Sequence, residues 1–180
     1  MNRQILRKEI ELYQTPYIEE DRYKSRFLDL LFFDNCFERS LLEGHITASA
    51  WVLTSDFKNV ALLHHKKLDR WLQPGGHADG DEDVKRVALK ELKEETSLVD
   101  VTQIGDSFFD LDIHKIPERK GIPEHDHYDV RFAFIATNPD QLRKNHESNK
   151  VDWKCLNELE KFVGNDSSII RMREKSLMMK

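Results

Sequence analysis

The sequence contains few cysteines and no long apolar run, and these two absences exclude several classes of protein. Cys36 and Cys155 are the only cysteines among 180 residues, and they have neither the density of a disulfide scaffold nor the spacing of a metal-binding motif. We interpret both as packing residues in a reducing compartment. The longest apolar stretch, residues 27–33, contains Asp29 and is far too short to span a bilayer. The first residues also lack a central apolar segment, so the sequence predicts a cytoplasmic protein without a membrane anchor.

An excess of basic charge is also missing. Lysine and arginine total 28 against 33 aspartates and glutamates, which gives a net charge of −5 and an isoelectric point near 5.9. This balance excludes a broad nucleic-acid-binding surface and argues against long nucleic acid as a partner. Seven glycines and five prolines, beside 39% hydrophobic and 34% charged residues, are typical of one globular domain with a packed core.

The composition of the chain changes at Gly44. Residues 1–44 contain two amphipathic segments, 2–13 and 19–33, which predict a helical hairpin packed on the main body, with a lid or a homodimer contact as alternatives. Residues 45–180 form the predicted main domain. Strands are expected at 46–52, 60–65, 99–104, 108–116 and 128–136, and helices at 83–97, 156–163 and 166–178. Because strands and helices do not alternate strictly, the pattern predicts an α/β sandwich with helices on a mixed sheet.

Three glutamates share one face of the predicted helix at residues 83–97. Glu91, Glu94 and Glu95 have the spacing i, i+3 and i+4, and their stripe continues an apolar stripe that includes Val84. A solvated helix with surface ion pairs is the alternative interpretation, since many charge-rich helices are of this kind. Like charges at this spacing repel, however, so an inward-facing cluster needs a compensating cation. Mg²⁺ and Mn²⁺ prefer carboxylate oxygens, and the stripe therefore predicts a divalent metal site beside a phosphate substrate.

The spacing around this helix resembles the Nudix box. In that pattern, G-x5-E-x7-R-E-U-x-E-E-x-G-U with U aliphatic, seven of the nine specified positions are matched over the 23 residues from Gly76 to Leu98. Lys90 stands in place of arginine, which keeps the positive charge but loses the planar guanidinium. Ser97 stands in place of glycine, at a helix end where left-handed backbone geometry is often required. Neither change removes a residue that the resemblance assigns to the metal.

The resemblance to the Nudix family implies a fold and an activity. The implied fold is an α/β/α sandwich around a mixed β-sheet, here with the N-terminal helical hairpin added. The implied activity is hydrolysis of the diphosphate linkage in a small-molecule nucleoside diphosphate derivative, by water activated on Mg²⁺ or Mn²⁺. Glu91 and Glu94 are the implied catalytic residues. The implied metal ligands are Gly76, through its carbonyl, Glu82, Glu91, Glu94 and Glu95.

The candidate substrate-binding residues are Trp71, His77, His127, Asp129 and Arg131, and all but His77 lie outside the box. Two interpretations are open for Trp71, stacking on a base or packing in the core, and two for Arg131, a phosphate clamp or an outward-facing side chain. The general base is either Glu91 or a residue of the segment 124–129. The eight histidines of the chain are too dispersed to predict a zinc site.

The function predicted from these residues is hydrolysis, and two alternatives follow from the same resemblance. A non-catalytic nucleotide sensor is the first, although a sensor gains nothing from like charges held close together. Isopentenyl diphosphate isomerases, which resemble Nudix proteins in fold, are the second. They use a catalytic cysteine, however, and neither Cys36 nor Cys155 has a matching neighbourhood. The substrate stays open among ADP-ribose, nucleotide sugars, CDP-alcohols, oxidised nucleoside triphosphates and capped RNA.

Overall fold

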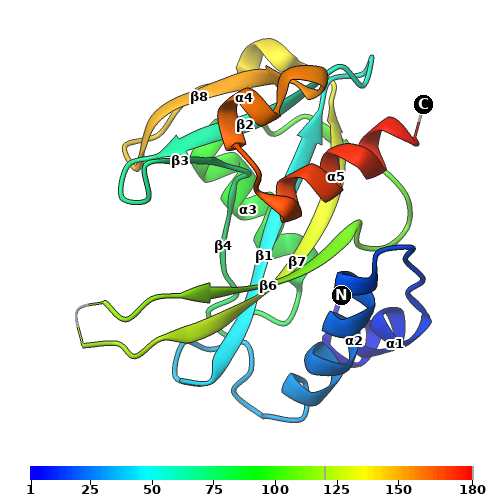
Figure 1. The fold of residues 1–180 in the computed structure, drawn as a ribbon, viewed down its shortest axis with the longest axis vertical. Coiled ribbons are helices and arrows are strands. Elements are labelled where there is room, and N and C mark those ends of the chain that lie inside the picture. Colours follow the sequence, from blue (N-terminus) through cyan, green and yellow to red (C-terminus); the bar gives the residue numbers. More distant parts are fainter. Residues whose placement is uncertain (120, 180) are drawn as a thin grey trace.

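A mixed β-sheet runs through the centre of the computed structural model, which describes residues 1–119 and 121–179 (Figure 1). Within these residues the sheet has eight strands. The strands are β1 (Gly44–Leu53), β2 (Asn59–His65), β3 (Arg70–Leu72), β4 (Gly75–His77), β5 (Val101–Gln103), β6 (Asp110–Ile116), β7 (His125–Ala136) and β8 (Ser148–Cys155). The helices are α1 (Arg3–Leu12), α2 (Ile18–Leu30), α3 (Val84–Thr96), α4 (Glu160–Val163) and α5 (Ser167–Leu177), with 3₁₀ turns η1 (Pro139–Gln141) and η2 (Leu156–Glu158).

The longest strands, β1 and β7, form a parallel pair at the centre of the sheet. Their residues pair from Gly44 with Asp126 to Leu53 with Ile135. β5 and β6 are antiparallel neighbours of β7, whereas β4 and β2 pair with different parts of β1. The sheet therefore divides beyond β1, with β4 on one side of the division and β2, β3 and β8 on the other. All ten residues of β1 are buried, as expected for a central strand.

Helices cover both faces of the sheet and give it two hydrophobic cores. α3 and the N-terminal helices pack on one face, where Ala48 of β1 and Leu92 of α3 belong to one buried cluster. α5 covers the other face, where Trp51 packs with Ile169 and donates its indole N–H to Ser176 at 2.8 Å. Strand alternation places Ala48 and Trp51 on opposite faces of β1. This layering confirms the predicted α/β sandwich around a mixed sheet.

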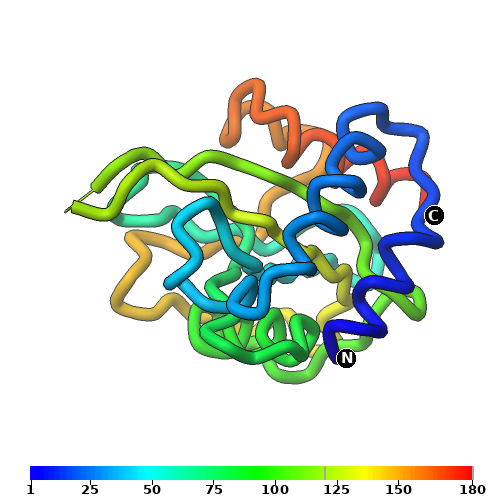
Figure 2. Tube along the Cα trace, turned by 90° about the horizontal axis from the view of Figure 1, so that it is seen from below, coloured from blue at the N-terminus to red at the C-terminus, as the bar shows by residue number. Residues whose placement is uncertain are grey.

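The two predicted N-terminal helices are present and share the first core. The Asn2 side chain caps α1 by accepting the N–H of Ile5 at 3.0 Å, and Leu6 and Phe27 are fully buried. In Figure 2 the hairpin lies along one side of the molecule, and the turn between its helices lies beside α5, to which it is hydrogen bonded. α2 ends three residues earlier than predicted, and Phe32, which lies in the predicted amphipathic segment 19–33 but beyond the end of α2, is 71% exposed.

Three strands differ from the sequence-based prediction, namely β3, β4 and β8. The Pro-Gly-Gly segment predicts a turn. It contributes to strand β4 instead, because Gly75 and Gly76 pair with β1. β8 is rich in charged and polar residues and forms a strand because it pairs along β2, from Asn59 to His65. These pairings of β4 and β8 join segments far apart in the chain, so local composition does not indicate them.

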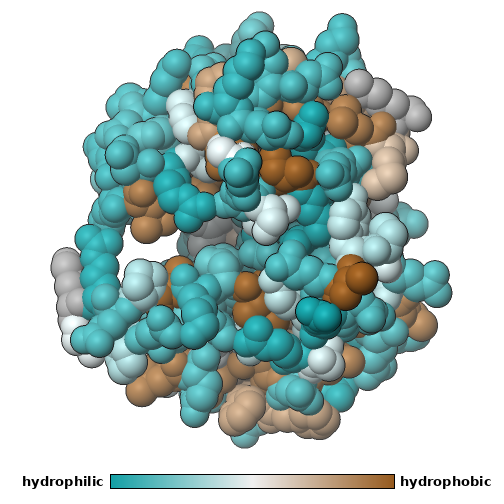
Figure 3. Space-filling view, in the orientation of Figure 1, coloured by the Kyte–Doolittle hydropathy of each residue, from teal (hydrophilic) through white to brown (hydrophobic). Residues whose placement is uncertain are grey.

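The surface of the molecule is mostly polar on the side shown in Figure 3. That side is hollowed at its left margin, between the β6–β7 hairpin and the part of the sheet that carries β3. Across the part of the chain that the structure describes, no helix combines the length and the apolar composition needed to cross a bilayer.

Candidate functional site

The glutamate stripe lies on α3, a helix with well-defined ends. Asp83 caps its start, and its side chain accepts the N–H of Arg86 at 3.2 Å. Ser97 ends the helix in the left-handed conformation, at φ 62°, and its N–H donates to the Lys93 carbonyl at 3.0 Å. This is the backbone geometry that the box resemblance indicates for position 97. The apolar side of α3 is buried against the sheet, and two of its carboxylates contact β4.

Gly76 on β4 leaves room for the Glu91 carboxylate. A Cβ atom built on Gly76 would lie 2.6 Å from Cδ of Glu91 and 2.8 Å from its Oε2, closer than real contacts allow. Only glycine therefore lets this carboxylate lie against the backbone of β4. Burial raises the pKa of Glu91, and the Lys90 ammonium, 3.3 Å from Oε1, offsets part of this effect.

Glu95 is the most buried of the three glutamates, with 8% of its surface exposed. Its Oε2 accepts the N–H of Gly75 at 2.9 Å, which fixes the carboxylate against β4. Burial raises the pKa of Glu95 to about 7; the Gly75 hydrogen bond opposes this rise, and neighbouring carboxylates add to it. The charge of Glu95 therefore changes near neutral pH.

The pH dependence of folding should report this carboxylate. Because the folded-state pKa of Glu95 lies above the ordinary value of 4.5, the folded state binds the proton more tightly, and this group destabilises the fold as the pH rises from about 4.5 to 7. Replacing Glu95 by glutamine should raise the free energy of unfolding at pH 8 by roughly 1–3 kcal/mol and change it little at pH 4.5. Urea unfolding in metal-free buffer at both pH values measures the difference, and equal changes at the two values would contradict this assignment.

The carboxylates face a cavity of about 440 Å³ that is also lined by the loop before β8. Its lining residues are Glu91, Glu94, Glu95, Asn145, His146 and Glu147. Sequence reasoning misses this loop, because residues 145–147 form no motif and reach the helix only through the pairing of β8 with β2. Glu147 adds a fourth carboxylate to the cavity, and its charge contributes to the raised pKa of Glu95.

The donor set of this cavity fits a hard divalent cation. Four glutamates offer carboxylate oxygens, and Lys90, which lies 3.3 Å from Glu91 and 4.0 Å from Glu94, supplies a single ammonium. The raised pKa values of Glu91 and Glu95, caused by burial, indicate that the described residues leave these carboxylates short of positive charge. Mg²⁺ and Mn²⁺ prefer oxygen ligands, so the chemistry of the cavity matches the metal that the box resemblance implies.

Glu82, another predicted metal ligand, does not line this cavity. Its carboxylate accepts the backbone N–H of Arg3 at 3.1 Å and lies 3.2 Å from Nε of the same residue. The N-terminal amino group pairs with the neighbouring Asp83 at 3.0 Å. The structure thus places Glu82 as a contact between α1 and the start of α3, a position that does not support a role as metal ligand.

Asp129 and Arg131, two predicted substrate-binding residues, lie inside the protein and pair with each other at 2.9 Å. Arg131 is only 2% exposed, and its guanidinium also lies 3.2 Å from Asp110 and 2.9 Å from Asp112. Asp129 accepts further hydrogen bonds from two hydroxyl groups of β1. Such burial fits neither an open phosphate clamp nor an outward-facing side chain, so we reassign Arg131 to a structural ion network.

Helix α5 supplies the remaining cations of this network. Arg171 donates to both oxygens of Asp110, at 2.8 and 2.9 Å, and Lys175 lies 2.8 Å from Asp110 and 2.6 Å from Glu20 of α2. Burial alone would raise the pKa of Asp110, but the hydrogen bonds from Arg171 and the nearby cations outweigh it and lower the pKa. Asp110 is therefore charged, and the network joins α2, α5 and the β6–β7 pair.

Trp71 belongs to a packed cluster beside β8. The Lys154 ammonium lies 4.1 Å from the centre of its ring and 4.1 Å from that of Phe162, and His64 meets the indole edge-on at 5.2 Å. Trp71 is not among the residues that line the glutamate cavity. This placement favours the packing interpretation of Trp71 over stacking on a base.

His77 and His127 lie together, and the structure adds His45 to them. The Nε2 atoms of His77 and His127 are 3.2 Å apart. Burial, together with the neighbouring histidines and, for His77, with Arg39, lowers the pKa of His77 to about 4 and that of His127 to about 2. Sequence reasoning misses His45, because only the β1–β7 register places it directly beside His127.

Comparison with protein families matches residues 44–172 to the NUDIX domain. No match is found among curated proteins. Solved structures with the same fold include an Ap4A hydrolase of C. elegans, with a TM-score of 0.60 and 22% identity over 74% of this chain and 96% of that chain. A dihydroneopterin triphosphate pyrophosphohydrolase of E. coli has a TM-score of 0.60 and 15% identity, covering 74% and 95%. A MutT protein of Methanosarcina mazei Go1 has a TM-score of 0.59 and 15% identity, covering 76% and 94%.

Proposed function

The chain belongs to the family of Nudix hydrolases, and from that premise we propose that it cleaves the diphosphate linkage of a small-molecule nucleoside diphosphate derivative with Mg²⁺ or Mn²⁺. The observation that carries this proposal is the cavity in which the carboxylates of α3 face Gly75 and Gly76 of β4. Half-buried like charges destabilise a protein that has no cation to place among them. A metal-dependent reaction explains why the chain holds them there.

The proposed roles follow from the contacts of each residue. Glu91, Glu94 and Glu95 would hold the divalent ion, with the Gly76 carbonyl as a backbone ligand. When bound, the ion neutralises charge that builds on the phosphoryl oxygens and lowers the pKa of the attacking water. The Gly75 N–H fixes the Glu95 carboxylate, and the bare Gly76 backbone leaves room for that of Glu91. The protein thus supplies placement, which is the main requirement of phosphoryl transfer.

Glu91 is the proposed general base. A base works best when its pKa approaches the working pH, and burial moves the pKa of Glu91 in that direction. The other candidate was the segment 124–129, whose carboxylates are engaged elsewhere. Glu124 pairs with Lys115 and Asp126 pairs with Arg26, each at 2.6 Å.

The proposed substrate is a small nucleotide. Two of the similar structures are named for hydrolysis of Ap4A and of dihydroneopterin triphosphate, and these two compounds are the first to test. ADP-ribose, nucleotide sugars and CDP-alcohols extend the panel. A net charge of −5 disfavours long RNA. Both cysteines are free thiols, which fits the cytoplasmic location that we include in the proposal.

A panel assay tests the proposed function. Each compound is incubated with the protein in Mg²⁺, in Mn²⁺ or in excess EDTA, and nucleotide products are separated by chromatography. We expect at least one compound to be cleaved within its phosphate chain, and only when metal is present. No cleavage across the panel, together with compounds that still raise the melting temperature, would replace the proposal by a nucleotide sensor.

A further inference from the structure

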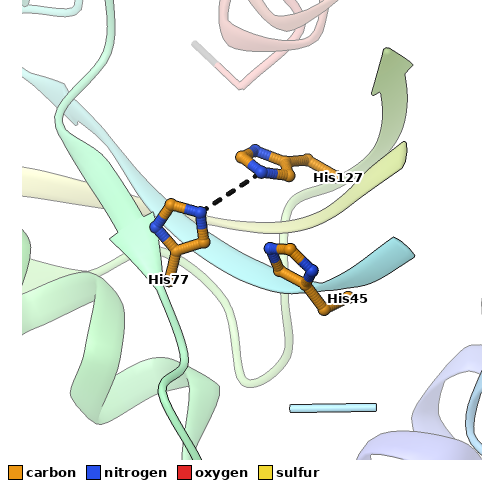
Figure 4. A group of neighbouring side chains, drawn as sticks. All are labelled: His45, His77 and His127. Carbon is orange, nitrogen blue, oxygen red and sulfur yellow. Dashed lines mark hydrogen bonds between the residues drawn. The ribbon is translucent and has the colours of Figure 1, made fainter. Parts of the chain in front are cut away.

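Three neighbouring strands bring three histidines to one place. His45 of β1 pairs directly with His127 of β7, and His77 of β4 pairs with Thr47, which lies on the same face of β1 as His45. Figure 4 shows the three imidazole rings turned toward a common space, with a hydrogen bond between His77 and His127. One potential ligand nitrogen from each residue lies within 4.8 Å of the other two.

The spacing of two of these nitrogens already matches a metal site. Two nitrogen ligands at about 2.0–2.1 Å from a tetrahedral zinc ion are about 3.3 Å apart. The Nε2 atoms of His77 and His127 are 3.2 Å apart. Each of these side chains can therefore direct a lone pair to one ion after a small rotation, which leaves the backbone of β4 and β7 in place.

His45 presents a buried acceptor that nothing in the described residues satisfies. Its side chain is 97% buried, since 3% of its surface is exposed, and its Nδ1 lies 3.4 Å from the Leu41 carbonyl. A carbonyl only accepts hydrogen bonds, so this contact assigns the hydrogen to Nδ1 and leaves a lone pair on Nε2. Nε2 has no hydrogen-bond partner among residues 1–119 and 121–179. Metal-binding histidines are commonly oriented in this way, by a carbonyl that accepts from the other ring nitrogen.

We propose that His45, His77 and His127 bind a first-row transition-metal ion, with Zn²⁺ as the probe of choice, at a site separate from the glutamate cavity. Imidazole suits such ions, whereas Mg²⁺ and Ca²⁺ prefer oxygen. The two sites lie on opposite sides of β4. The absent side chain of Gly76 would point at Glu91, so the next side chain, that of His77, points to the other face of the strand.

The bound ion would link β4, which meets β1 over only a short length, to the long β1–β7 pair. β4 has three residues, and it pairs with β1 only at positions 47–49. A metal held by one residue each of β1, β4 and β7 fixes β4 to the central pair. Three protein ligands also leave one tetrahedral position for water or an added anion. The site therefore goes beyond the diphosphate chemistry proposed above and does not depend on it.

Zinc titration of the full chain, produced without a histidine tag, tests the site. The chelator-treated protein is titrated with Zn²⁺ by calorimetry in saturating Mg²⁺, which occupies the carboxylates. We expect one equivalent to bind and to raise the melting temperature, and Co²⁺ to give the visible absorption of a four-coordinate nitrogen site. The His77→Gln/His127→Gln double variant should bind Zn²⁺ at least about 100-fold more weakly. His65→Gln, outside the cluster on β2, should bind like wild type.

Two results would overturn this assignment. The first is absence of Zn²⁺ binding by wild type that unfolds cooperatively, and the second is tight binding that survives in the double variant but is lost in Glu91→Gln. If the double variant fails to fold, His45→Gln replaces it, with the same expected loss. A negative hydrolysis panel leaves these measurements unaffected, so the failure of either proposal can be told from the failure of the other.

Discussion

Replacing Glu91 by glutamine should lower metal-dependent turnover by at least about 100-fold and leave the fold intact. Glutamine keeps the shape that fits beside Gly76, but it removes a charged ligand and the proposed proton acceptor. Because burial raises the pKa of Glu91, its charged form destabilises the metal-free protein at pH 8. The variant should therefore unfold at the same urea concentration as wild type or at a higher one. The turnover number and the urea midpoint measure the two effects.

Glu158→Gln is the matched control for this experiment. It makes the same chemical change at an exposed glutamate of η2, which pairs with Lys161 at 2.6 Å. Such surface pairs contribute about 0–1 kcal/mol, so turnover and stability should both stay close to wild type. Full activity in Glu91→Gln would exclude the metal and base roles, and loss of folding would identify the Glu91 carboxylate as structural.

Replacing Arg131 by methionine should lower the free energy of unfolding by about 3–5 kcal/mol. Arg131 is surrounded by three buried aspartates, and methionine can fill part of the space but cannot pair with them. The remaining cations, Arg171 and Lys175, contact the cluster from α5 alone. Arg131→Lys should also be destabilised, because one ammonium cannot reproduce the planar guanidinium contacts. Urea unfolding at pH 7.5 measures both variants.

A matched control and a pH series separate lost charge from lost packing. Arg86 makes two hydrogen bonds to Asp81, at 2.6 and 2.8 Å, but this pair is exposed, so Arg86→Met should cost no more than about 1 kcal/mol. Burial alone would raise the pKa of Asp112, but the Arg131 charge outweighs it, helped by a hydrogen bond from His114, and lowers the pKa. This carboxyl therefore contributes stability above its ordinary pKa of 3.8 and loses it as the pH falls. The difference between wild type and Arg131→Met should shrink below pH 4, and a constant difference would indicate lost packing alone.

The parts of the site that can be predicted from sequence are those set by one helix. Glu91, Glu94 and Glu95 follow from helical periodicity, and α3 presents two of them to β4. The same local geometry explains the left-handed Ser97 at the helix end. The sheet and its flanking helices could likewise be predicted in outline, since each long element has its own hydrophobic pattern.

The parts that could not be predicted depend on strand register. Glu147 reaches the glutamate cavity through the pairing of β8 with β2, and His45 reaches His127 through the pairing of β1 with β7. Strand alternation correctly predicts the face of β7 on which Arg131 lies. Whether that face is open to solvent depends on α5, which lies over it. The contact made by Glu82 also depends on a distant segment, because its partner Arg3 comes from the N-terminal helix. A pattern in one segment carries no information about which distant segment will cover it.

The buried ion network gives this chain a folding unit that is larger than its region of family similarity. The family match covers residues 44–172, whereas Glu20 and Lys175, which pair at 2.6 Å, lie on either side of it. A fragment trimmed to the matched region would lose both residues and would leave Asp110 without its Lys175 partner. It would also expose the apolar surface that Leu6 and Phe27 cover. The region of sequence similarity and the region held together by buried contacts therefore have different boundaries in this protein.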